Sequence, residues 1–156
     1  MEITLNVRLA EVLAAVAVKS AYAEAKKPGA EGPEERMSTV DEDDELLKPM
    51  VKESWADVVN EATHMCAFVS DESVEGDNEE YRLTLRVSEH FNVALIPAME
   101  TLLKEYLVNS VLGKWYMPAD KEASAACLAT AAGQLGSLHE MWQWRNRMCE
   151  RKPSVF

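Results

Sequence analysis

The sequence predicts a mainly α-helical fold: a bundle of about four helices with a small antiparallel β-hairpin or three-stranded sheet. Several long segments repeat apolar residues every three or four positions, which is the spacing of one helix face. Two short segments instead alternate polar and apolar residues, as half-buried strands do. The 156 residues suffice to bury a core without disulfides, so we expect a single domain over 1–156.

The strand signals lie far apart in the chain. Residues 2–7, EITLNV, and residues 81–87, YRLTLRV, both alternate strictly. A short apolar segment at 68–69 precedes the second of these, separated from it by the acidic, glycine-containing stretch DESVEGDNEE. We therefore expect a hairpin over about 67–88 with a long acidic tip, to which the N-terminal strand could add as a third strand.

Residues 8–26 have the period of a helix with many alanines. The apolar positions of its predicted inner face are Leu9, Val12, Leu13, Val16 and Tyr22. The following stretch, 26–38, contains two prolines and two glycines and no large apolar residue before Met37, so it is predicted to be a loop.

The segment TVDEDDE, which begins at Thr39, carries five consecutive acids at 41–45. Thr39 and Glu42 have the spacing of a capping box, and acids in a first helical turn interact favourably with the helix dipole. A calcium-binding EF-hand loop starting at Asp41 would need Gly at 46 and Glu at 52, where the chain has Leu and Lys. We therefore expect a helix start here, which Pro49 should kink or restart.

Three further helical stretches follow from the spacing of apolar residues. The helix that begins at Thr39 carries an apolar stripe made of Val51, Trp55, Val58, Val59, Ala62 and Cys66. The most apolar helix, 92–116, is predicted to be the central one, with Pro97 in its early turns and Gly113 and Pro118 ending it. Its stripe is Leu95, Met99, Leu102, Leu103, Tyr106, Leu107, Val111 and Trp115.

The last helix is predicted over 119–149, with Pro118 and Asp120 marking its start and a basic C-terminal end. One face is apolar: Leu128, Ala131, Leu135, Leu138 and Trp142. Other positions are small and should allow a second helix to approach closely: Ala123, Ala126, Ala129, Ala132, Gly133 and Gly136.

Composition narrows the functional classes. The net charge is −11 and the pI about 4.7, so the chain is not expected to coat nucleic-acid phosphates. An acidic surface could line a channel past which DNA slides, mimic DNA toward a basic partner, or serve only solubility, and charge does not separate these. No apolar run reaches the roughly 20 residues that span a bilayer, and Glu11 interrupts the signal-peptide-like run near the N-terminus.

No enzyme signature is present in the sequence. The three cysteines, Cys66, Cys127 and Cys149, form no CxxC pair, which suits a reducing cytoplasm. Cys66 and Cys127 are expected to pack in the core, and no histidine can be assigned to basic-flanked Cys149. There is no glycine-rich phosphate loop, nucleophile elbow or HExxH, so we predict no catalytic residue and no cofactor.

Glu61 and His64 form an E-x-x-H on the second long helix, the unit that di-iron bundles use twice. His90 and His139 lack a glutamate three residues earlier, so the second unit is missing. We expect a surface pair here rather than a metal site. A small helical metalloenzyme that uses Glu61 and His64 is kept as a competing hypothesis.

Trp142 and Trp144 lie two residues apart, so they face different sides of one helix. One of them can belong to the core. The other, beside arginines and with Met141 or Met148, has the composition of an interface.

The order of these elements, with RMSTVDEDDELL opening a helix, the hairpin strand YRLTLRV, the helix segment YLVNSVLGKWY and an arginine-rich end closed by RKP, resembles a family. The family comprises small virion structural proteins of the head–tail junction of tailed phages and prophages, of connector, adaptor or neck-ring type. The resemblance covers nearly the whole chain.

The resemblance implies a homo-oligomeric ring, often of twelve copies, that is assembled in the host cytoplasm and docks between portal and tail proteins in the virion. DNA would pass near its acidic surface without specific binding, and no active site is implied. The hairpin or the C-terminal segment Arg151–Phe156, which belongs to the predicted tail 150–156, would reach a neighbour. The candidate interface residues are Trp142, Trp144, Arg145, Arg147, Arg151, Phe156, Glu75 and Asp77. The alternative is an acidic regulatory or DNA-mimicking protein that binds a basic host partner.

Overall fold

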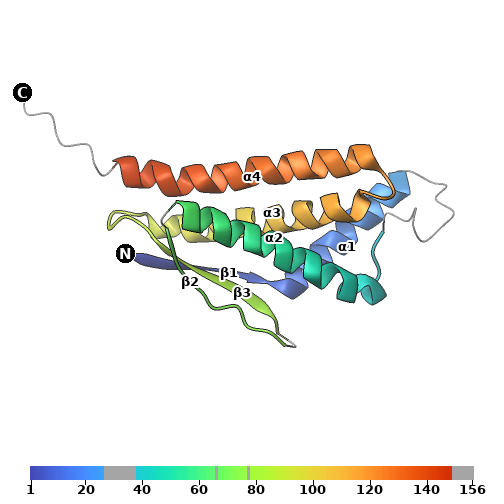
Figure 1. Ribbon diagram of the computed structural model, residues 1–156, viewed down its shortest axis with the longest axis horizontal. Coiled ribbons are helices and arrows are strands. Elements are labelled where there is room, and N and C mark those ends of the chain that lie inside the picture. The colour runs from blue at the N-terminus through green and yellow to red at the C-terminus, as the bar shows by residue number, and fades with distance from the viewer. Residues whose placement is uncertain (27–37, 66, 77, 149–156) are drawn as a thin grey trace, which may run out of the picture.

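The computed structural model describes residues 1–26, 38–65, 67–76 and 78–148, with side chains up to 142 in the last helix. Four helices and a three-stranded antiparallel sheet make up the described fold, which confirms the predicted class (Figure 1). The elements in chain order are β1 (Glu2–Arg8), α1 (Leu9–Lys26), α2 (Asp44–His64), β2 (Phe68–Asp71), β3 (Glu80–Arg86), α3 (Ile96–Tyr116) and α4 (Lys121–Met148). Short 3₁₀ turns, Asp41–Asp43 and Val93–Leu95, lead into α2 and α3.

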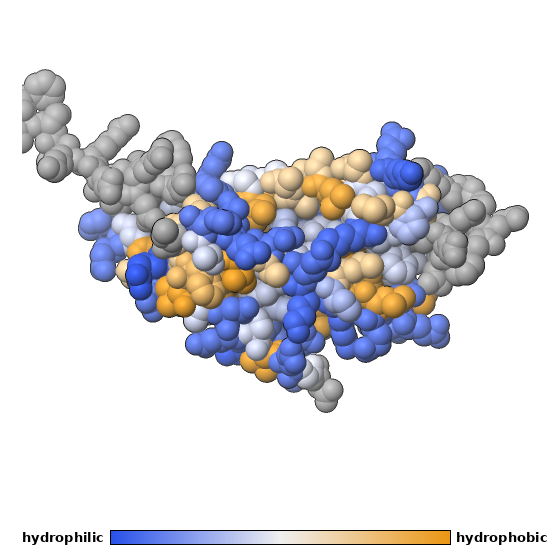
Figure 2. Space-filling model, in the orientation of Figure 1, coloured by the Kyte–Doolittle hydropathy of each residue, from blue (hydrophilic) through white to orange (hydrophobic). Residues whose placement is uncertain are grey.

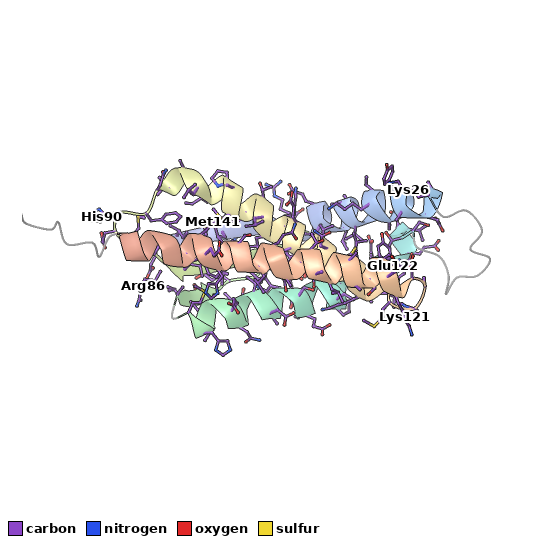
Figure 3. The ribbon with its side chains drawn as sticks, turned by 90° about the horizontal axis from the view of Figure 1, so that it is seen from above. Lys26, Arg86, His90, Lys121, Glu122 and Met141 are labelled. Atoms are coloured by element: carbon purple, nitrogen blue, oxygen red, sulfur yellow. The ribbon has the colours of Figure 1, made fainter. Side chains whose placement is uncertain are left out.

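The elements form three layers. In Figure 1 the sheet lies at the bottom, α1, α2 and α3 lie in the middle, and α4 lies on top. Viewed from above, α4 runs over the others, with α1 and α2 on opposite sides of it (Figure 3). α3 contacts β1 on one side and α4 on the other, and it also packs on α1 and α2. The prediction that this helix is central is therefore confirmed.

The sheet has the order β1-β3-β2, so the middle strand comes last in the chain. β1 pairs with β3 in register, with Leu5 opposite Leu83, and both of these side chains are fully buried. The alternation seen in the sequence is the physical reason: every second residue of β1 and β3 points to the helices, and the others face solvent. The hairpin and the added third strand are thus confirmed.

The start of α2 differs from the prediction in one detail. The five acids do open helical structure, but Thr39 does not cap it. Instead the N–H of Val40 donates to the carboxylate of Asp43 at 2.9 Å, one residue later than expected. The Thr39 hydroxyl turns inward and lies 3.3 Å from the hydroxyl of Ser20 on α1. A buried tertiary hydrogen bond has taken the place of the local cap.

Of the two alternatives predicted for Pro49, a kink or a restart, the restart is wrong, and so is the inner position predicted for Tyr22. α2 continues from Asp44 to His64 through Pro49, which therefore does not restart the helix. Pro49 lies near the start, where the lost N–H costs one hydrogen bond. Tyr22, expected on the inner face of α1, is 64% exposed, and Lys26 lies over its ring at 4.4 Å.

Gly113 was expected to end α3, but it lies inside the helix and is buried. A Cβ at this position would lie 2.5 Å from Leu128 Cγ on α4. The hydroxyl of Ser124 donates to the carbonyl oxygen of Gly113 at 2.5 Å. The glycine therefore sets how closely α3 and α4 approach each other.

Five of the six small residues of α4 that were predicted to allow close approach are not at that contact; the sixth, Ala123, is partly buried against the core. Ala126, Ala129, Ala132, Gly133 and Gly136 are exposed, and a Cβ on Gly133 or Gly136 would meet nothing within 4 Å. Close packing of α3 and α4 is achieved on the opposite face of α4, at Ala131, Leu138 and Trp142, as its predicted apolar stripe indicates.

Candidate interaction site

The β2–β3 hairpin lies below α2, with its acidic tip projecting from the helices (Figure 1), and it lines a groove together with α2. Beyond the end of β2, Val74 and Glu80 exchange both backbone hydrogen bonds, at 2.8 and 3.1 Å. The turn itself includes Gly76 with a φ of 135°, a conformation that side-chain-bearing residues rarely adopt. This glycine lets the chain reverse and return as β3.

A groove of about 240 Å³ runs between α2 and the hairpin. This volume is enough for one long side chain. Six lining residues matter for its chemistry: Lys52 and Trp55 from α2, and Asp71, Glu75, Glu79 and Tyr81 from the hairpin. We call this site the acidic groove.

The inner wall of the acidic groove is aromatic. Trp55 and Tyr81 are each 3% exposed, and their ring centroids lie 5.1 Å apart at an interplanar angle of 39°. Burial raises the pKa of Tyr81 well above its ordinary value, and the nearby Glu79 carboxylate adds to this shift. Tyr81 therefore stays a neutral hydrogen-bond donor.

Each ring donates to one of the two flanking carboxylates. The indole Nε1 of Trp55 donates to Asp71 Oδ2 at 3.3 Å, and the hydroxyl of Tyr81 donates to Glu79 Oε1 at 3.1 Å. Ser73 donates to the other oxygen of Asp71 at 2.6 Å. Both carboxylates are thus held in place by neutral donors.

Lys52 lines the groove and Lys48 lies in the adjoining pocket, and each of these lysines is paired with an acid. Lys52 Nζ lies 3.0 Å from Glu75 Oε1, and Lys48 Nζ lies 3.0 Å from Glu45 Oε1. These pairs, together with Glu79, raise the pKa of both lysines. Among the described residues, Asp71 and Glu79 form no ion pair, so the groove carries net negative charge.

The structure places the predicted interface residues in different regions. Glu75 is exposed on the acidic groove. Trp142 is 2% exposed and belongs to the core, so it is not a surface residue of this chain. Trp144, Arg145 and Arg147 lie in the last turns of α4, where side chains are not described.

The remaining candidates, Asp77, Arg151 and Phe156, lie outside the described residues. The C-terminal part of α4 lies at the same end of the molecule as the residues that follow β3. Figure 3 shows Met141 toward the end of the molecule that carries His90 and Arg86, whereas Lys121 and Glu122 lie near Lys26 at the other end.

The E-x-x-H pair is not a unit in the structure. Glu61 turns to His139 on α4, whose Nδ1 lies 2.5 Å from Glu61 Oε1, while His64 is exposed. Within the described part of the chain, no group of three or more His, Cys, Asp or Glu side chains could hold a metal ion. Cys127 is partly buried, and burial raises the pKa of its thiol.

The acidic groove was only partly visible in the sequence. Trp55 and Tyr81 were assigned to apolar faces, and Glu75 was singled out at the hairpin tip. Asp71 and Glu79 were missed because they lie on opposite arms of the hairpin and meet only after it closes against α2. The sequence does contain a signal for this pair of acids: both flank the predicted turn of the hairpin, and Glu79 lies two residues before Tyr81.

Comparison of the chain with protein-family models, with curated proteins and with solved structures finds no match. None of the helices in the described ranges has the length and apolar character needed to cross a membrane.

Proposed function

We propose that this protein is a structural subunit of the head–tail junction of a tailed phage or prophage, a connector or adaptor that docks as a ring between portal and tail. The sequence resemblance to that family is the starting point. One geometric observation supports the proposal: two different elements that could contact neighbouring subunits, the acidic hairpin and α4, lie on opposite layers of one subunit.

These two elements are the acidic hairpin and α4. The hairpin tip extends below the helices, while α4 covers the top layer (Figure 1). A ring requires head-to-tail contacts, in which one surface of a subunit meets a different surface of the next. A subunit with distinct elements on opposite layers suits such a contact.

Surface charge supports the same role. The face shown in Figure 2 is mostly hydrophilic with separate apolar patches, and the chain carries a net charge of −11. In a ring, such a surface would let DNA pass without binding, because like charges repel. Virion localisation, assembly in the host cytoplasm and contacts with portal and tail proteins all belong to this proposal.

Quantitative mass spectrometry of purified particles tests the proposal. We expect the protein in the particle at about the copy number of the portal, which for a ring is close to twelve copies. Hundreds of copies would indicate a tail-tube or capsid protein instead. Absence from particles, with clear expression in infected cells, would overturn the structural role.

One observation favours a second candidate, an acidic protein that binds a basic host partner. Asp71 and Glu79 present carboxylates without an ion-pair partner among the described residues, as a site for a cationic surface would. Recovery of one stoichiometric DNA-binding protein from a host lysate would favour this candidate over the junction ring.

A further inference from the structure

We propose that the acidic groove binds arginine or lysine side chains of the basic segment Arg145–Lys152 of a second copy of this chain. This inference rests on the proposed ring, because it names the contact that would join adjacent subunits. The reasoning combines the chemistry of the groove, the charge of the segment and the positions of both in the fold.

The groove offers two anionic acceptors that are already oriented. Asp71 and Glu79 are held by neutral donors at 3.3 and 3.1 Å, from Trp55 and Tyr81 respectively. Each donor is uncharged, and within the described residues neither carboxylate forms an ion pair, although Lys48 and Lys52 interact with Glu79 at longer range. A guanidinium or ammonium group can therefore add charge-assisted hydrogen bonds without displacing an existing ion pair.

The aromatic wall suits the same ligand. The Trp55 and Tyr81 rings are both 3% exposed, so they act as an apolar wall that holds the two carboxylates rather than as free faces for a cation. Trp55 and Tyr81 line the groove side by side. Acids beside aromatic rings form a site for a cation on a long apolar stem, which is the shape of arginine and lysine.

Lys52 already shows where a cation is stable. Its ammonium group lies at the groove and bonds Glu75, and both side chains remain largely exposed. Glu75 and Glu79 both raise its pKa. A partner's cation would bind Asp71 and Glu79, beside the Lys52–Glu75 pair.

The chain itself supplies a matching basic segment. Although the protein carries 27 acids against 16 lysines and arginines, the stretch Arg145–Lys152 has three arginines and one lysine against a single acid, Glu150. Opposite charge on two segments of the same chain favours association between copies. The part of this segment beyond Met148 lies outside the described residues.

The fold sets the two sites apart. The first residues of the segment, 145–148, form the end of α4 on the top layer, whereas the acidic groove lies between α2 and the hairpin of the bottom layer (Figure 1). Contact between two different surfaces of neighbouring copies is head-to-tail, which closes into a ring when the rotation permits. Thus one repeated contact would build the assembly.

Self-association of the full-length protein tests this contact. Native mass spectrometry and sedimentation would compare the wild type with the double variant Asp71→Asn, Glu79→Gln, which keeps hydrogen-bond acceptors but removes both charges. We expect association to weaken by about tenfold or more, since it loses charge-assisted hydrogen bonds. The double variant Glu72→Gln, Glu140→Gln removes two exposed acids outside the groove and should associate like the wild type.

A charge exchange makes the test specific. Changing Arg145, Arg147 and Arg151 to Glu should weaken association at least as strongly, because it reverses the charge of the segment. Combining those changes with Asp71→Lys and Glu79→Lys should restore it, which loss of folding could not do. Circular dichroism confirms that each variant is folded.

A synthetic peptide of residues 143–156 covers the case in which the wild type stays monomeric. Calorimetry should detect saturable binding to the full-length protein that the Asp71→Asn, Glu79→Gln variant loses. No binding would overturn the inference. If the Asp71→Asn, Glu79→Gln variant assembles as well as the wild type, the inference is also overturned, but the ring proposal still stands. Absence of the protein from virions would instead overturn the ring proposal, whatever the groove binds.

Discussion

His139 on α4 and Glu61 on α2 form a hydrogen bond of 2.5 Å between the imidazole Nδ1 and the carboxylate Oε1, across 78 residues of sequence. It joins the top layer of the molecule directly to the middle one. Both side chains are about one-third exposed, at 33% and 31%, so solvent screens the pair.

A double-mutant cycle with Glu61→Gln and His139→Gln should therefore give a coupling free energy of about 0.5–1 kcal/mol. Urea unfolding of the four proteins measures it. His64→Gln is the control, because His64 is exposed although it has the E-x-x-H spacing. A coupling of zero for His139, or a comparable one for His64, would contradict the structural assignment.

Gly113→Ala should destabilise the protein by about 1–3 kcal/mol, because the added methyl overpacks a tight contact. Its Cβ would lie 2.5 Å from Leu128 Cγ and 3.3 Å from the backbone nitrogen of the same residue. The matched control is Gly133→Ala, where nothing lies within 4 Å and alanine should stabilise the helix by about 0.5–1 kcal/mol. Thermal unfolding distinguishes the two; stabilisation by both substitutions would show that α3 and α4 are not in close contact.

Ser20→Ala should cost about 1–3 kcal/mol, since it leaves a buried backbone donor without its acceptor. The Thr39 N–H donates to Ser20 Oγ at 3.0 Å, and both residues are buried. Thr63→Ala serves as the control, because the Thr63 hydroxyl is exposed and bonds only its own helix. Urea unfolding measures both variants. If they are equally stable, the hydrogen bond between α1 and the segment before α2 does not contribute to stability.

Alkaline pH should lower the stability of the protein between pH 10 and 12. Burial raises the pKa of Tyr106 and Tyr116 from 10.0 to about 12. Below pH 10 both tyrosines keep their protons in the folded and unfolded states, so stability is unaffected. Above it the unfolded chain loses them first, and each tyrosine lowers the free energy of unfolding by about 1.4 kcal/mol per pH unit.

Urea midpoints measured at pH 9, 10 and 11 test this dependence. Tyr116→Phe should reduce the alkaline slope, because it removes one of the contributing groups and no hydrogen bond of the Tyr116 hydroxyl is found within the described residues. A wild-type stability that stays constant to pH 12 would show that these tyrosines are accessible to solvent.

The spacing of apolar residues predicted the helices and strands well, because a strand buries every second residue and a helix buries one side. Leu5 and Leu83 illustrate this: the sequence placed both on inner faces, and the structure pairs them in the core. The predicted stripes of α3 and α4 hold for the same reason, since Leu103 and Leu138 are both fully buried.

The errors arise where a tertiary neighbour decides the outcome. Thr39 had the local spacing of a cap, but Ser20 from another helix offered its side chain a buried partner. Gly113 resembled a helix stop, whereas Leu128 requires its small size. Similarly, the acidic groove depends on Asp71 and Glu79 meeting across a turn, and spacing along one element does not contain that information.

The sheet order also determines when the molecule can complete its structure during synthesis. The hydroxyls of Thr4 and Thr84 lie 3.0 Å apart on β1 and β3, although 80 residues separate them in the chain. At roughly 5–20 residues per second, a ribosome needs several seconds between making the two strands. Throughout that interval β1 has no strand to pair with, and its apolar side chains depend on early packing against α1 or on chaperones to avoid aggregation.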